Sequence, residues 1–255
     1  MLKKKVSKIL LLITVFLVIT SSVALAAPGI SISDGGITIQ NTGDPQEIST
    51  SIKLLLLLTV LSLLPSILIM MTSFTRIIIV LSFLRNSMGT QQIPPNQIVV
   101  GLALFLTFFI MNPVFTDINN DALKPFAENQ ISMEEAIDIS STRAKEFMLE
   151  YAYDKDIALF AEIAEEDPPE NLTDLPLTVV VPAFMISELK TAFFMGFMLY
   201  IPFLVIDMVV ASTLMSMGMM MLPPVMISMP FKILLFLLVD GWNLITKQIV
   251  ESFVR

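Results

Sequence analysis

The residues with the clearest chemical potential lie in one methionine-rich stretch, Leu214 to Pro230, which reads LMSMGMMMLPPVMISMP. Thioether sulfur is a ligand for copper(I), and the alternation Met215-x-Met217-x-Met219 would offer three such ligands. The chain has no cysteine and no histidine that would complete that site. Methionine is also flexible and polarizable, so the same stretch could form a soft constriction, or simply a turn between two apolar helices. The residues alone leave all three interpretations open.

Three charged residues interrupt the longest apolar tracts: Glu188, Asp207 and Lys232. An ionised side chain at membrane depth costs free energy, so it marks a transport pathway, a protein–protein contact or a helix end near the headgroups. Two carboxylates support aspartyl proteolysis only when they converge on one water molecule. On a continuous helix Glu188 and Asp207 would lie roughly 28 Å apart, which argues against that chemistry. Lys190, two residues from Glu188, points to another side of a helix, so we expect these two not to pair.

The overall composition is that of a membrane protein. The 255 residues are 55% hydrophobic and only 15% charged, with a mean hydropathy of +0.81. A net charge of −8 without a basic patch argues against a nucleic-acid partner. The absence of cysteine and histidine removes disulfides, zinc–thiolate sites and the commonest general base. We therefore expect neither an enzyme nor a bound cofactor.

The first fifty residues divide into two segments. Residues 1–26 fit a cleavable signal peptide, with four lysines, an apolar run from Ile9 to Ile19 and Ala24-Leu25-Ala26 at the cleavage site. An uncleaved first span is the alternative. Residues 27–50 are polar and glycine-containing and show no sustained periodicity, so we expect a mobile tail outside the cytoplasm.

Two helical hairpins are predicted, at residues 51–115 and 177–255, because their apolar runs approach the roughly 20 residues that span a bilayer. In the first, residues 54–84 are interpreted as one long helix, kinked at Pro65, whose second half packs against protein or at an interface. Its partner is predicted from Gln97 to Met111, capped by Asn96 and ended by the Asn112-Pro113 pair. In the second hairpin the methionine-rich stretch is the turn, and residues 243–255 form a final amphipathic helix.

An acidic segment, residues 116–176, separates the two hairpins. Ser132 and Glu135 have the spacing of a capping box, which predicts that a helix begins there. Apolar residues, including Phe147 and Phe160, then recur at helical spacing, so the segment is amphipathic. These two aromatic residues either dock a partner or pack two short helices on each other.

Two blocks of the chain carry a family resemblance. Residues 73–114 read SFTRIIIVLSFLRNSMGTQQIPPNQIVVGLALFLTFFIMNPV, and residues 182–242 contain SELK, the methionine-rich stretch and PFK. Both blocks resemble the FliP/SctR family of type III secretion export-gate proteins. The signal peptide and the sizeable acidic segment resemble the flagellar branch of that family rather than the virulence injectisome branch.

The resemblance implies an all-α, membrane-associated fold whose helical hairpins assemble into a ring-like pore complex. About five copies would form a helical ring with one FliR-type subunit and several FliQ-type subunits. The complex would lie in the bacterial inner membrane at the flagellar basal body and face largely the periplasm. It would be the pore through which unfolded flagellar proteins cross and the base on which rod subunits assemble.

The resemblance also implies residue roles. In the family a methionine-rich loop closes the pore like a gasket, and the matching residues are Met217, Met219, Met220 and Met221. The family uses the glutamate of SELK and the lysine of PFK, here Glu188 and Lys232, for contacts between adjacent subunits. A ring of subunits would supply partners for these two charges and for Asp207. Phe147 and Phe160 match aromatic residues implicated in assembly.

A second function class remains compatible with the same residues. A secondary transporter or ion channel would place Asp207 in its permeation path. It would show substrate-specific flux by the isolated chain, whereas an export-gate subunit would need its partner subunits.

Overall fold

The computed structural model describes residues 30–33, 36–39, 45–90, 93–166, 171–219 and 221–253. The predicted signal peptide and Met220 lie outside the described residues. The chain forms two compact units, residues 1–64 and residues 65–255.

The first unit contains a β-hairpin that the sequence analysis did not anticipate in residues 27–50. Strands β1 (Ile30–Ser33) and β2 (Gly36–Ile39) pair in antiparallel register, with Ile30 opposite Ile39 and Ile32 opposite Ile37. The physical reason is the alternation of isoleucine with small or polar residues in ISIS and GITI, a period of two that is typical of strands. Helix α2 (Pro45–Met70) begins in this unit.

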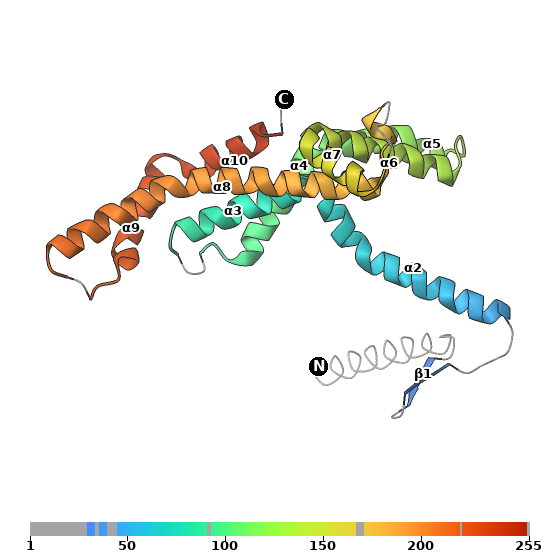
Figure 1. Cartoon of the computed structure of the whole chain (residues 1–255), viewed down its shortest axis with the longest axis horizontal. Coiled ribbons are helices and arrows are strands. Elements are labelled where there is room, and N and C mark those ends of the chain that lie inside the picture. Colours follow the sequence, from blue (N-terminus) through green and yellow to red (C-terminus); the bar gives the residue numbers. More distant parts are fainter. Residues whose placement is uncertain are drawn as a thin grey trace, which may run out of the picture. The chain divides into compact units, whose positions relative to one another are not determined.

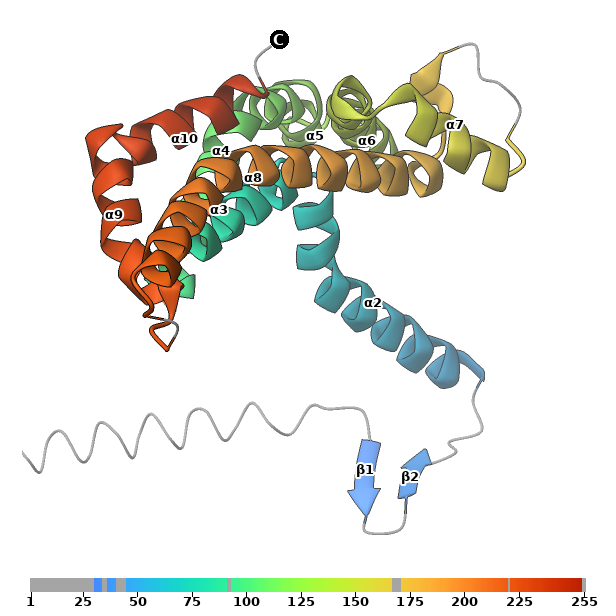
Figure 2. The same cartoon turned by 60° about the vertical axis from the view of Figure 1, so that its left-hand side comes forward.

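The second unit is entirely helical in its described residues, as predicted for the all-α class. Helix α8 runs through the whole unit with α3 beside it (Figure 1). After α8 the chain turns back into α9, and α10 follows after a bend, which Figure 2 shows most clearly. The helices are α3 (Phe74–Ser87), α4 (Asn96–Ile118), the π-helix η2 (Asn119–Leu123), α5 (Lys124–Ala127), α6 (Met133–Tyr151), α7 (Asp154–Ile163), the 3-10 helix η3 (Leu172–Asp174), α8 (Leu177–Ser216), α9 (Pro224–Leu238) and α10 (Gly241–Glu251).

The single long helix expected over residues 54–84 is wrong, because the helix is interrupted between Met70 and Phe74. The Thr72 hydroxyl donates a hydrogen bond to the Ile69 carbonyl at 3.0 Å and accepts one from the Phe74 amide at 3.4 Å. Threonine thereby offers the backbone an alternative to the next helical turn. The expectation that the second half packs against protein is confirmed, since Ile77 and its neighbours on α3 are buried.

Helix α4 differs from its prediction at both ends. Pro95 holds the N-cap position and Asn96 is the first helical residue. At the other end the helix continues through Pro113 to Ile118. Met111 and Val114, on either side of this proline, pack in the same buried cluster. We infer that the stabilisation from this packing exceeds the cost of the backbone hydrogen bond that a proline removes from a helix.

Two buried clusters hold the second unit together. The first cluster joins α3, α4, α8, α9 and α10, and the second joins α4, α6, α7 and α8 with Phe253. The first cluster consists of Ile77, Val80, Leu81, Leu84, Met88, Val99, Ala103, Ala192, Phe203, Phe236, Ile245 and Ile249. The second consists of Met111, Phe147, Met148, Ile157, Leu175, Val179, Val180, Ala183, Phe184 and Phe253.

The described residues include two helical stretches that are long and apolar enough to cross a membrane, Asn96–Ala127 and Leu177–Ser216. The pair α9 and α10, bent by 65°, makes a third if it counts as one span. Much of the apolar surface of α4 and α8 is exposed in the single chain. The fold is therefore that of a membrane-associated helical protein.

Candidate functional site

The methionine-rich stretch forms the connection between α8 and α9, and we call residues 217–223 the Met loop. Helix α8 ends through Gly218, whose φ of +76° lies in the left-handed region that glycine tolerates best. The amides of Gly218 and Met219 donate back to the carbonyls of Met215 and Leu214, each at 3.0 Å. Pro224 then starts α9, because its fixed φ suits a first helical turn. The predicted turn between two apolar helices is confirmed.

The methionines of this loop point away from the core of the single chain. Met221 is 98% exposed, Met217 64% and Met219 39%. Three of the four predicted gate residues therefore share one exposed connection, and the fourth, Met220, is not described. A loop built for core packing would bury these side chains. Packing within the single chain therefore does not account for the choice of methionine at these positions.

A largely buried ion pair bridges α8 and α9, the two helices that the Met loop joins. Lys232 Nζ on α9 is 2.6 Å from Asp207 Oδ2 on α8 and donates to the Ser87 carbonyl at 3.1 Å. The Ser228 hydroxyl donates to Asp207 Oδ1, so both carboxylate oxygens have partners. Lys232 is only 2% exposed. The pair joins the two helices that carry the loop and attaches them to the end of α3.

A second buried ion pair lies further along α8. Arg76 on α3 donates to Glu188 through Nε, at 2.9 Å from Oε2, and through Nη2 to Oε1. Its remaining nitrogen, Nη1, donates to the carbonyl and hydroxyl oxygens of Ser252, each at 3.0 Å. Glu188 is fully buried in this fork. Paired forks of this kind are among the strongest hydrogen-bonded ion pairs in proteins.

These two pairs correct one step of the sequence analysis. The resemblance led us to expect that a ring of subunits would supply partners for Glu188, Asp207 and Lys232, whereas the single chain supplies a partner for each of them. Glu188 and Lys232 do not pair with each other. Contacts of these residues between subunits stay a prediction. Sequence reasoning missed Arg76, and the available signal was a cation at the edge of the apolar run Ile77 to Leu84.

A third ion pair holds the acidic segment to α8. Asp156 on α7 accepts hydrogen bonds from Lys190 and from the Ser187 hydroxyl, the latter at 2.9 Å. Burial disfavours the charged carboxylate, yet the bonds from Lys190 and Ser187 hold the pKa of Asp156 below its usual value. Glu188 and Lys190 each pair elsewhere, which confirms that they do not pair together.

The aromatic residues of the acidic segment pack inside the chain. The Phe147 ring lies 5.9 Å from that of Phe184 on α8 and 6.4 Å from that of Phe253, centroid to centroid. Phe160 is partly buried against the same second cluster. These contacts attach α6 and α7 to α8, and a role of the two residues in assembly stays a prediction. The capping box is confirmed, since Ser132 Oγ accepts a bond from the Glu135 amide at 3.1 Å.

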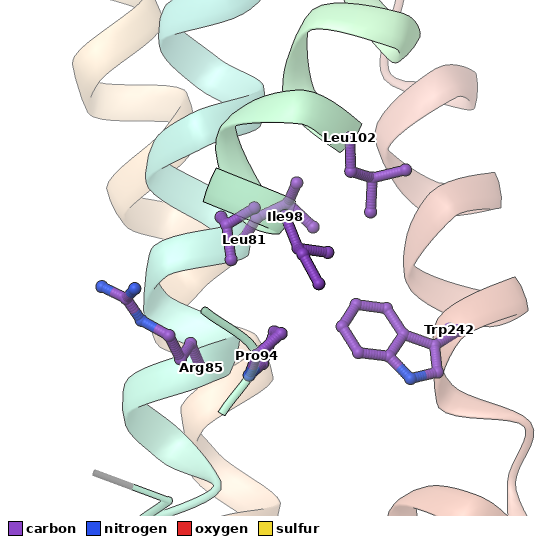
Figure 3. A pocket seen from close by; sticks show the side chains of 7 residues that line it. Leu81, Arg85, Pro94, Ile98, Leu102 and Trp242 are labelled. Atoms are coloured by element: carbon purple, nitrogen blue, oxygen red, sulfur yellow. The ribbon is translucent and has the colours of Figure 1, made fainter. Parts of the chain in front are cut away.

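A small apolar pocket lies between α3, α4 and α10. Figure 3 shows the Trp242 ring facing Ile98 and Leu102 across it, while the guanidinium of Arg85 points away. The remaining lining residues are Leu81, Pro94 and Val99. None of these side chains is a nucleophile, a carboxylate or a general base, so the pocket offers no catalytic group.

The comparison with known proteins decides the family. The model of the FliP family matches residues 57–249, a region that contains every candidate residue predicted from the sequence. This chain belongs to the FliP family. Flagellar biosynthetic protein FliP of Bacillus subtilis is 63% identical over 217 residues, which cover 85% of this chain and 98% of that protein.

Other relatives with the same name agree with this assignment. Flagellar biosynthetic protein FliP of Pectobacterium carotovorum is 53% identical over 82% of this chain and 81% of its own length. That of Aquifex aeolicus is 53% identical over 80% of this chain and 86% of its own length. The resemblance to the FliP/SctR family, and to its flagellar branch, is confirmed.

Proposed function

We propose that this chain is a core subunit of the flagellar type III protein export gate, the pore through which unfolded flagellar proteins cross the inner membrane. Membership of the FliP family and the flagellar names of its relatives support the flagellar assignment. In this proposal the second unit faces largely the periplasm, and the assembled complex is the base on which rod subunits begin to assemble.

The observation that carries the proposal is the exposed Met loop, together with the ion pair that bridges the two helices it joins. Several copies of such a loop, brought together around an axis, would form a ring of thioether side chains. Methionine adapts its rotamers to whatever it contacts, so this ring would seal around many different polypeptides without a matching pocket. Asp207 and Lys232 would hold the two helices of each hairpin while the loop deforms.

Exposed aromatic side chains support the proposed assembly. Phe105, Phe108 and Phe109 on α4 are exposed, as are Phe193, Phe194 and Phe197 on α8. Large apolar patches of this kind mark protein–protein or membrane contacts. We propose that neighbouring copies, about five in all, together with FliQ-type and FliR-type subunits, cover these faces.

A leak assay tests the gasket. Met219, Met220 and Met221 are replaced together by alanine in cells that produce the complete set of partner subunits, and entry of a small solute is measured. We expect a leaky membrane, because alanine removes the thioether side chains that fill the constriction.

The matched control replaces Met133 by alanine. Met133 lies on α6 and is also exposed, but it is remote from the Met loop in the sequence. We expect the membrane of cells with this variant to remain impermeable to the small solute. Equal permeability of the triple variant and the control, at equal protein levels, would contradict the gasket.

A further inference from the structure

We propose that Ser252 and Phe253, the two residues that follow α10, form a strap that closes over the buried guanidinium of Arg76. By docking there, the strap fixes the arm made of α9 and α10 against α3, α6 and α8. The consequence of this docking for the Met loop rests on the proposed function.

The hydrogen bonds of Arg76 give the first reason. Nε and Nη2 donate to the Glu188 carboxylate, and Nη1 donates to the two oxygens of Ser252. Arg76 is 3% exposed, so water cannot readily replace them. A buried donor left without an acceptor loses its hydration and gains nothing in return. The strap therefore completes the coordination of a charge that the core already contains.

The aromatic ring of the strap gives the second reason. Arg76 Cζ lies 3.8 Å from the centroid of the Phe253 ring, within the range of a cation–π contact. The Tyr151 hydroxyl on α6 donates to the Phe253 carbonyl at 2.6 Å. Phe253 is thus held from two different helices, by Arg76 on α3 and by Tyr151 on α6, while Ser252 is held by Arg76.

The position of the strap between the two buried clusters gives the third reason. Ile245 and Ile249 on α10 belong to the first cluster, and Phe253 belongs to the second. Docking of the strap is therefore the step by which the end of α10 joins both clusters. Ser252 and Phe253 lie just beyond the region that the family model matches.

The strap also explains how a bent arm is held. The chain turns by 65° between α9 and α10, where Asp240 has a φ of +50° (Figure 2). Near the Met loop the arm is attached to α8 through Lys232 and Asp207, and beyond the bend it is attached through the strap, Arg76 and Glu188. Ser252 and Phe253 are accordingly positioning residues for the α9 side of the loop.

Hydrogen–deuterium exchange of the full chain in detergent, read by mass spectrometry, tests the strap. Phe253→Leu keeps an apolar side chain but removes the aromatic face, and Tyr151→Phe removes only the hydroxyl that holds the Phe253 carbonyl. We expect the amides of α10 to exchange at least about tenfold faster in both variants, because the end of the helix loses its attachment. The control is Lys247→Ala, a substitution at an exposed residue of α10 that forms a solvated ion pair with Glu251 on the same helix.

The Tyr151→Phe variant keeps the test valid if Phe253→Leu fails to fold, since it deletes a single oxygen atom. Unchanged exchange of α10 in Tyr151→Phe, with or without a folded Phe253→Leu variant, would overturn the strap. Exchange that rises equally in the Lys247→Ala control would overturn it as well. The exchange measurement does not involve solute entry, so failure of the gasket and failure of the strap are separate results.

Discussion

Lys232 Nζ lies 2.6 Å from Asp207 Oδ2, so a buried cation on α9 faces a carboxylate on α8, and the Met loop joins these two helices. Removing one member of such a pair leaves the other charge buried without compensation, and that costs more than the pair contributes when intact. This relationship decides how the hairpin should respond to substitution.

Asp207→Asn is expected to destabilise the chain by about 3 kcal/mol, because Lys232 keeps its charge and loses its carboxylate. The double variant Asp207→Asn with Lys232→Met should recover part of this loss, since no uncompensated charge remains. Thermal unfolding of the detergent-purified chain measures Asp207→Asn, Lys232→Met and the double variant. Strictly additive effects of the two substitutions would contradict the pairing.

The same substitution separates the export gate from a transporter. A transporter with Asp207 in its permeation path requires substrate-specific flux by the isolated chain in liposomes, abolished by Asp207→Asn. We expect no such flux from the chain alone, because both oxygens of Asp207 are already held by Lys232 and Ser228. Specific flux in the unmodified chain would favour the transporter.

Arg76→Lys is expected to lower the free energy of unfolding by about 2 kcal/mol. A lysine ammonium cannot reproduce the planar fork that serves Glu188 and Ser252 together. The control is Arg143→Lys, since Arg143 is a surface arginine whose ion pairs with Asp121 and Glu146 are largely solvated. Urea unfolding of both variants should show a loss at position 76 and little change at position 143; equal small changes would argue against the buried fork.

Gly241→Ala should disturb the bend between α9 and α10. A Cβ atom at this position would lie 2.2 Å from a ring atom of Phe236, so the ring or the backbone must move. We expect a loss of about 1–3 kcal/mol from this crowding. Gly101→Ala is the control: it adds a methyl group inside α4 where no atom lies within 4 Å, and it should be neutral or stabilising. The two variants are compared by thermal unfolding, and equal stability would contradict the close contact at Phe236.

The attachment of α7 should weaken in acid. The pKa of Asp156 is lower in the folded chain than in the unfolded one, so its stabilising contribution is complete above the unfolded value of about 4. The contribution falls as the pH drops through the lower folded pKa. The groups facing this carboxylate are Lys190 and Ser187 on α8 and Lys155 beside it on α7.

Amide exchange of residues 154–163, measured between pH 7 and pH 3 and corrected for intrinsic rates, reports this loss. Asp156→Asn should already exchange faster at pH 7 and should show a smaller change in acid. The control is Asp154→Asn, a substitution in the same first turn of α7 at a carboxylate that forms no ion pair within the described residues. An acid response that persists unchanged in Asp156→Asn would contradict the assignment to this carboxylate.

Local sequence signals predicted the elements with strong periodicity or a defined cap. The capping box at Ser132, the helices of the acidic segment and the turn at the methionine-rich stretch follow from hydrogen bonding and side-chain spacing within a few residues. The β-hairpin at residues 30–39 carries the same kind of local signal in its alternating isoleucines, and the sequence analysis passed over it.

The remaining features depend on contacts between distant parts of the chain. Helix α4 continues through Pro113 because Met111 and Val114, on either side of it, pack in the second cluster. The proline alone does not predict this packing. The partner of Glu188 is Arg76, 112 residues earlier in the chain, and nothing in the spacing of either residue identifies the other. Conversely, the methionines of the loop could be singled out from the sequence, because so many methionines in one short stretch are unusual. The structure adds that those it describes are exposed.

Native mass spectrometry tests the central claim most directly. The full chain is purified in detergent after co-expression with FliQ-type and FliR-type subunits, and the mass of the intact complex is measured. The account predicts one defined complex with about five copies of this chain together with both partner types. A monomer or simple dimer that binds neither partner would contradict the export-gate assignment.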